Sequence, residues 1–231
     1  GNLFELSPAN ARTVMINSPI FSQRKLRQLL ALEDFANAHV RLDLFLREGE
    51  HLAAAVDRLC AQAEAAVRDG AVILLLSDRF PGAGAIPVHA LLATGAIHLH
   101  LVRAGLRCDC NLIVETGTAR DAHHFACLIG YGATAVYPYL AYQTLFDLGR
   151  SGALKGKRGS ERAELGRSYR RGIKKGLLKI ISKMGISTIG SYRGAQLFEI
   201  VGLADEVVAL CFPGVPSRIK GADFACLHDD A

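Results

Sequence analysis

The sequence predicts an α/β fold with a parallel β-sheet and βα repeats, resembling an incomplete TIM-type barrel. Short apolar runs alternate with helical patterns, and the connections between them are short, which is typical of parallel strands joined by helical crossovers. About six segments read as strands, two fewer than a closed eight-stranded barrel needs. We expect residues 1–231 to form a single domain, with a basic loop and helix inserted at about 149–184.

The strands are expected where apolar residues alternate with polar ones or form short unbroken runs. The run AVILLL is typical of a strand that is buried on both faces of a parallel sheet. The six expected strands are residues 14–16, 40–46, 71–76, 111–114, 133–137 and 186–189.

Helices are expected between these strands. The clearest spans residues 50–69, where apolar residues recur every three or four positions and Gly70 follows as a C-terminal cap. Ser22 is a candidate cap for a helix that ends near Leu32. The other helices in this part of the chain are expected at 86–105, 120–129 and 139–148.

A basic segment follows the last of these helices. Residues 149–160 carry four glycines and read as a loop, and a long helix is expected at about 161–184. Between Lys155 and Lys183 there are eleven Lys/Arg and two Glu, so the net charge of +5 is a local excess. An apolar stripe along this helix predicts that one face packs against protein; its members are Leu165, Tyr169, Ile173, Leu177, Ile180, Ile181 and Met184. The tail 212–221 is expected to be irregular.

Several kinds of site are excluded by their missing motifs. The chain has no phosphate-binding G-x-x-x-x-G-K-[ST] loop, no G-x-S-x-G nucleophile elbow and no C-x-x-C pair. His98 and His100 would point about 200° apart on a helix, so they cannot share a metal ion. We expect no catalytic, cofactor-binding or metal-binding residues in this chain. Its six cysteines are expected to be reduced, in a cytoplasmic protein without a membrane span.

Polar residues gather where two expected strands end. In parallel α/β sheets, ligands bind outside the carboxyl ends of the strands, and six residues are expected near that edge: Ser77, Asp78, Arg79, Glu115, His123 and His124. They line a polar pocket or an interdomain contact in one interpretation. In the other they form buried salt bridges and helix caps that hold the loops.

Three long blocks carry a resemblance to a known family. They are IPVHALLATGAIHLHLVR from Ile86, VETGTARDAHHFACLIGYGATAVYPYL from Val114, and GLLKIISKMGISTIGSYRGAQLFEIV from Gly176. Together with Ser77-Asp78-Arg79 upstream and 216–219 downstream, they closely resemble the central domain of the glutamate synthase large (alpha) subunit. The resemblance covers about residues 3–226.

The resemblance implies a role inside a larger enzyme. Family members join a glutaminase domain, this central domain, and a barrel that binds FMN and an iron–sulfur cluster. Ammonia released from glutamine travels through a channel and aminates 2-oxoglutarate at the flavin. The resemblance therefore implies that this chain links the glutaminase and FMN domains of the same polypeptide and helps form the ammonia channel. It also implies that the full-length enzyme works with a small electron-donor subunit or ferredoxin.

Two alternative functions stay open at the level of sequence. The strand-end carboxylates and histidines are consistent with an independent small-molecule α/β enzyme. The basic helix 161–184 is consistent with a nucleic-acid binder, although few aromatic residues lie among its charges, so nucleic acid is not the expected partner.

Overall fold

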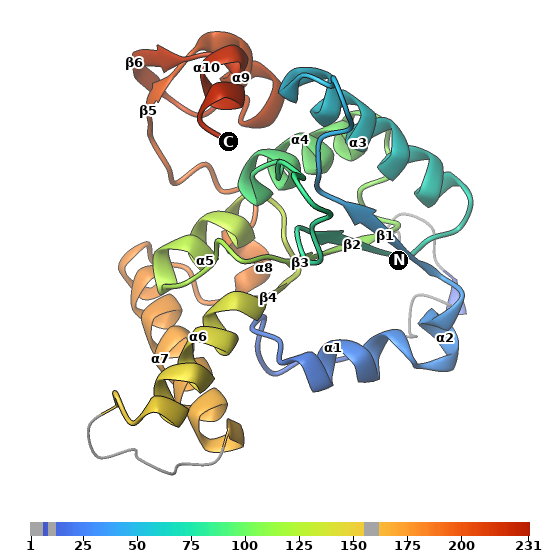
Figure 1. The fold of residues 1–231 in the computed structure, drawn as a ribbon. Helices are drawn as coiled ribbons and strands as arrows, with labels where there is room; N and C mark the ends of the chain where they lie inside the picture. Colours follow the sequence, from blue (N-terminus) through green and yellow to red (C-terminus); the bar gives the residue numbers. More distant parts are fainter. Residues whose placement is uncertain (1–6, 9–12, 155–161) are drawn as a thin grey trace.

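The protein is described here by a computed structural model that covers residues 7–8, 13–154 and 162–231. Its centre is a four-stranded sheet in the order β1-β2-β3-β4, in which every neighbouring pair is parallel (Figure 1). The strands are β1 (His39–Asp43), β2 (Ile73–Ser77), β3 (Asn111–Glu115) and β4 (Ala135–Tyr137). The predicted parallel sheet is confirmed, and each of these strands overlaps a segment expected from the sequence.

Three helices cover one face of the sheet. They are α3 (Leu52–Arg68), α4 (Ala90–Arg103) and α5 (Ala122–Gly130). The strands lie side by side in chain order, and each crossover helix packs on the same face, which is the arrangement of half a TIM-type barrel. Leu74 and Leu112 of the sheet belong to the apolar core on this side. The fold class predicted from the sequence is therefore confirmed.

The opposite face of the sheet is covered by helices from two parts of the chain. The helices are α1 (Gln23–Leu30), α2 (Glu33–Ala36) and α6 (Tyr139–Ser151), and Figure 1 shows α1 and α2 on the far side of the sheet from α3. Ser22 caps α1 as predicted, since its Oγ accepts a hydrogen bond from the Lys25 amide at 3.3 Å. A second apolar cluster joins Leu26 of α1 to Ile73, Ile113 and Tyr142.

The basic helix α7 (Arg162–Lys183) packs against α5 and α6. Its predicted apolar stripe is confirmed for most members, of which Leu165, Ile173, Leu177 and Ile181 are buried. The prediction is wrong for Met184, which lies beyond the end of the helix and is 48% exposed.

A second, two-stranded parallel sheet lies near the end of the chain. It pairs β5 (Ile200–Leu203) with β6 (Ser217–Ala222) and is followed by α10 (Phe224–Asp229). The other helices in this part are α8 (Ile189–Tyr192) and α9 (Asp205–Cys211). Residues 212–221 are therefore not wholly irregular as predicted, because a strand occupies 217–222.

Two expected strands are wrong. Residues 186–189 do not form a strand, because the Thr188 hydroxyl accepts from the Ser191 amide and caps the short helix α8. Residues 14–16 have no regular secondary structure and are exposed. The sheet pairing occurs a few residues later, where Ile20 forms a parallel bridge with Val136 at the outer edge of β4.

Two further expectations concern the chain as a whole. In the part of the chain that the structure describes, no helix is both long and apolar enough to cross a membrane. The six cysteines form no disulfide in the structure, and their reduced state stays a prediction.

Candidate functional site: the strand-end edge

Polar residues of three neighbouring strands meet at the carboxyl end of the main sheet, a region we call the strand-end edge. The parallel register pairs Asp43 with Ser77 and Ser77 with Glu115, so the last residues of β1, β2 and β3 lie in one row. Because alternate residues of a strand point to the same face, Arg41 shares a face with Asp43.

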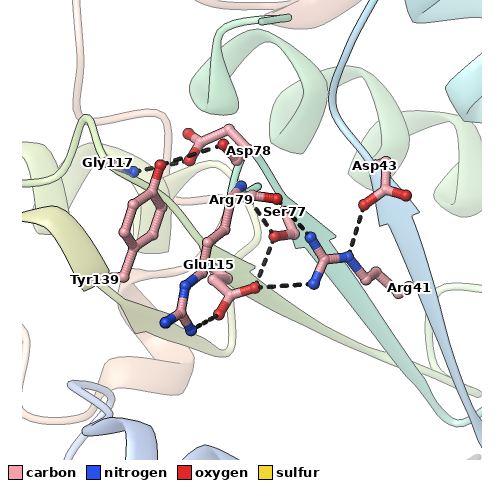
Figure 2. A network of polar contacts seen from close by, with 8 residues as sticks. All are labelled: Arg41, Asp43, Ser77, Asp78, Arg79, Glu115, Gly117 and Tyr139. Atoms are coloured by element: carbon pink, nitrogen blue, oxygen red, sulfur yellow. Dashed lines mark hydrogen bonds and ion pairs between the residues drawn. The ribbon is translucent and has the colours of Figure 1, made fainter. Parts of the chain in front are cut away.

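Glu115 is the centre of an ion-pair network (Figure 2). Its side chain is only 4% exposed. One carboxylate oxygen accepts from Arg79 Nη1 at 3.0 Å; the other accepts from Ser77 Oγ at 2.7 Å and lies 3.5 Å from Arg41 Nη1. Arg41 also donates from Nε to Asp43 at 2.6 Å. Both oxygens of the buried carboxylate are thus engaged by protein donors.

Arg79 is held in place by aromatic rings as well as by Glu115. Its guanidinium carbon lies 4.5 Å from the ring centre of Phe80, 5.7 Å from that of Tyr137 and 5.5 Å from that of Tyr139. Phe80 itself is 70% exposed and has a backbone φ of 68°, a strained conformation for a residue other than glycine. These contacts fix the orientation of Arg79 against the buried carboxylate.

Asp78 points away from this network and holds the loop after β3. Its Oδ1 accepts from the Gly117 amide at 2.9 Å, and its Oδ2 accepts a short hydrogen bond from the Thr116 hydroxyl. The hydroxyl of Tyr139 donates to the Asp78 carbonyl oxygen at 3.2 Å. Burial raises the pKa of Tyr139 to about 12, so this hydroxyl stays protonated at neutral pH.

His123 and His124 lie at the start of α5 and serve its N-terminus. The carboxylate of Asp121 accepts from the amides of both histidines, and the His124 imidazole accepts from the amides of Arg120 and Asp121 in return. These reciprocal bonds form a capping box. Among the described residues, no hydrogen bond or ion pair joins either histidine to Glu115 or Asp78.

A largely apolar cavity of 670 Å³ lies beside Asp78. The apolar part of its wall includes Phe45, Leu92, Leu140, Leu203, Phe212 and Leu227. Its polar residues include Asp78, His89, Thr118 and Tyr139. Burial lowers the pKa of His89, although the nearby Asp78 carboxylate opposes the effect, and the imidazole is therefore neutral at pH 7.

The chemistry that this edge supports is limited. Within the described ranges, no cluster of three or more His, Cys, Asp or Glu residues is suited to a metal ion. Cys127 Sγ lies 3.6 Å from His123 Nε2, but burial raises the thiol pKa to about 11, so a reactive thiolate is not formed at neutral pH. Ser77 donates to a carboxylate that two arginines already bind, so it has no free base to activate it.

The structure brings together four of the six predicted site residues: Ser77, Asp78, Arg79 and Glu115. Their contacts are ion pairs and hydrogen bonds that hold loops. This is the second of the two interpretations made from the sequence. Arg41 and Tyr139 were missed by sequence reasoning. Arg41 lies in the strand expected at 40–46, but the observed strand already ends at Asp43, so its place near the carboxyl end could not be predicted from the sequence.

Comparison with known proteins identifies the family. Residues 1–204 match the model of the glutamate synthase central domain. The chain belongs to this family. It is 38% identical over 240 residues to the NADH glutamate synthase of Saccharomyces cerevisiae, covering 100% of this chain and 11% of that protein. The NADPH glutamate synthase large chain of Bacillus subtilis is 37% identical, with 100% of this chain and 15% of that protein covered.

Relatives whose names give ferredoxin as the electron donor have a similar sequence identity to this chain. The chloroplastic ferredoxin-dependent glutamate synthase of Oryza sativa subsp. japonica is 42% identical, covering 95% of this chain and 14% of that protein. The central-domain chain thus spans between 11% and 15% of the length of these three relatives.

Among solved structures, a flavocytochrome b2 variant with pyruvate bound matches at a TM-score of 0.46 and 12% identity, covering 88% of this chain and 46% of that one. A match at this level adds nothing to the fold described above.

Proposed function

We propose that this central domain links the glutaminase and FMN domains of a glutamate synthase large subunit and forms part of the wall of its ammonia channel. The proposal combines the family of the chain with the chemistry of the strand-end edge. In this role the domain binds no substrate covalently and positions the groups that neighbouring domains supply.

The observation that carries the proposal is that the carboxylates of the strand-end edge are already committed to protein partners. Glu115 is bound by Arg41, Arg79 and Ser77, and Asp78 by a backbone amide and a hydroxyl. A general acid or base needs a proton-accepting atom that a substrate can reach. Such fully bonded carboxylates favour a scaffold over an independent small-molecule enzyme.

The apolar cavity beside Asp78 supports the channel part of the proposal. Ammonia is neutral, and its transfer into apolar surroundings costs far less than the transfer of the ammonium ion or of another charge. A wall formed largely of residues such as Leu92, Leu140 and Phe212 therefore favours passage of the neutral molecule. The carboxylates in the wall are those of Asp78, which is already bound by the Gly117 amide and the Thr116 hydroxyl, and of Asp230.

Cofactors and partners follow from the same proposal. FMN and the iron–sulfur cluster would belong to a neighbouring domain of the polypeptide and not to residues 1–231. Electrons would reach that domain from a small electron-donor subunit or from ferredoxin. A cytoplasmic location is proposed as well, although some of the relatives are chloroplastic enzymes.

A single bulky substitution in the full-length large subunit tests the channel. Leu140 lines the cavity and is 45% exposed, so Leu140→Trp fills part of the cavity without disturbing the core. We expect glutamine-dependent glutamate formation to fall about tenfold, a barrier increase of about 1.4 kcal/mol. Glutamine hydrolysis should stay unchanged, so that free ammonia accumulates in the medium. Both products are measured in the same assay.

Leu148→Trp is the matched control. Leu148 lies on the same helix, is 40% exposed and does not line the cavity. It should leave both activities at the wild-type level. Equal rates of glutamate formation in Leu140→Trp and wild type, with no ammonia released, would contradict the assignment of this cavity to the channel.

A further inference from the structure

A smaller hollow lies between residues 16–19, α7 and α8. It has a volume of 290 Å³, and we call it the Lys174–Arg193 groove. Its apolar wall includes Ile16, Pro19, Leu177, Leu178, Ile181 and Ile189. Two cationic side chains, Lys174 and Arg193, complete the lining together with a few small polar residues.

Arg193 is partly buried, and one of its donors has no acceptor among the described residues. Its Nε is buried and has no hydrogen-bond partner, and burial lowers the pKa of its guanidinium with a further contribution from Arg107. Each nitrogen of Arg107 already donates one hydrogen bond, to His98 Nδ1 at 2.9 Å and to the carbonyl oxygens of Cys110 and Gly132 at 2.7 and 2.8 Å. A buried, unpaired donor costs free energy, and the described residues supply no acceptor for this one.

The charge around the groove is equally one-sided. Residues 162–183 contain eight Lys/Arg and one Glu. In the parts of the chain that are described, no carboxylate lies within ion-pair distance of Lys174 or Arg193. Leu178 lies one turn after Lys174 on the same helix face and is 57% exposed. An apolar contact surface thus adjoins two cations that have no anionic partner among the described residues.

We propose that the Lys174–Arg193 groove receives an apolar, carboxylate-bearing segment from another domain of the same polypeptide. Its Asp or Glu side chain would lie between Lys174 and Arg193, and a neighbouring apolar side chain would cover Leu178. A carboxylate is the matching acceptor because it can take hydrogen bonds from both cations at once. The inference rests on the proposed linking role, and the family relatives are long enough to supply such a segment, since this chain spans at most 15% of those compared above.

A zero-length cross-link in the intact large subunit tests this contact. A carbodiimide joins a lysine amine to a carboxylate only when the two already touch. We expect Lys174 to couple to an Asp or Glu outside residues 1–231 with several times the yield found at Lys179. Lys179 is a suitable internal control because it is exposed on the same helix and does not line the groove. The coupled peptides are identified by mass spectrometry.

Three results would overturn the proposal. They are equal coupling at Lys174 and Lys179, coupling of Lys174 to Glu5 or another residue of this domain, and coupling between copies in a mixture of isotopically labelled and unlabelled protein. The readout does not depend on ammonia transfer. Failure of the channel test at Leu140 therefore leaves the cross-link informative, and the reverse also holds.

A variant supplies an independent check. Leu178→Gln removes the apolar contact without adding a carboxylate that the carbodiimide could couple to Lys174, and it should reduce Lys174 coupling severalfold, while glutamine hydrolysis reports that the protein is folded. The matched control, Leu148→Gln, alters a 40% exposed leucine on α6 and should leave the coupling unchanged. Unchanged coupling in Leu178→Gln would contradict a contact that includes this leucine.

Discussion

The strand-end edge and the Lys174–Arg193 groove both present two cations, but only the first supplies their anion. At the strand-end edge, Arg41 and Arg79 converge on the buried carboxylate of Glu115. In the groove, Lys174 and Arg193 have no carboxylate within reach in the described structure, and Arg107 beside them adds more positive charge. The difference separates a region that is complete within this chain from one that needs another domain.

The comparison also indicates what each region contributes to stability. A buried ion pair that is fully hydrogen-bonded is costly to break, because removal of one partner leaves the other charge buried. An unpaired cation contributes no such interaction to the isolated chain. Substitutions at the strand-end edge and near the Lys174–Arg193 groove test this contrast.

The largest effect is expected for Glu115→Gln. The change removes the counter-charge of Arg79 and leaves Arg41 with Asp43 alone, at a position where the side chain is only 4% exposed. We expect the free energy of unfolding to fall by about 3 kcal/mol, near the low end for a broken buried pair because both arginines reach solvent. Denaturant unfolding at pH 7 measures it. An exposed pair is the control: Glu199→Gln, opposite Arg218, should cost less than about 1 kcal/mol.

An intermediate effect is expected from pH in the region of the groove. Burial lowers the pKa of His98 to about 4, with further contributions from Arg107 and Arg193. Because the unfolded chain binds a proton near pH 6.5 and the folded chain does not, stability is lost as pH falls from about 6.5 towards 4. We expect a loss of about 1 kcal/mol between pH 7 and pH 5 from this residue, allowing for partial solvent exposure.

His98→Asn is the variant that isolates this effect. The asparagine side-chain oxygen can still accept from Arg107 Nε but does not titrate. The difference in unfolding free energy between pH 7 and pH 5 should shrink in the variant. A difference as large as in the wild type would assign the pH dependence to other groups, such as His89, whose pKa burial also lowers.

The smallest effect is expected for Arg193→Met in the isolated chain. Methionine keeps most of the side-chain volume and removes a cation that has no acceptor, so stability should stay within about 0.5 kcal/mol of the wild type or rise. The same change at Arg79 should cost about 2 kcal/mol, because it removes a direct partner of Glu115. Equal losses in the two variants would show that the two regions do not differ as described.

The main sheet and its crossover helices could be predicted from the sequence because their signals are local and strong. The run at 71–76 has no polar residue, and the helix at 50–69 has a clean apolar stripe with a glycine after it. The second sheet could not be predicted, because β5 and β6 have no buried apolar run, with Val201 68% and Ile219 60% exposed. Their pairing depends on tertiary contact, including the close approach of Gly221 to the backbone of Gly202.

The strand-end edge was predictable in part. Asp78 and Glu115 follow the ends of two parallel strands, and that rule placed them together with Ser77 and Arg79. The two histidines were misplaced relative to this network because their role is local: they complete a cap with Asp121, three residues from His124. Arg193 carried no signal, since a buried donor without an acceptor is visible only once the surrounding backbone is placed.

The bridge between Ile20 and Val136 has a practical consequence for work on this domain. An unpaired strand edge is a template for joining other chains and promotes aggregation. Backbone bonds from Phe21 to Val136 and from Val136 to Pro19, both 2.8 Å, occupy the outer edge of β4 with the domain's own chain. A truncated form that begins after Phe21 would uncover this edge, and we therefore expect it to precipitate during expression where the longer form stays dispersed.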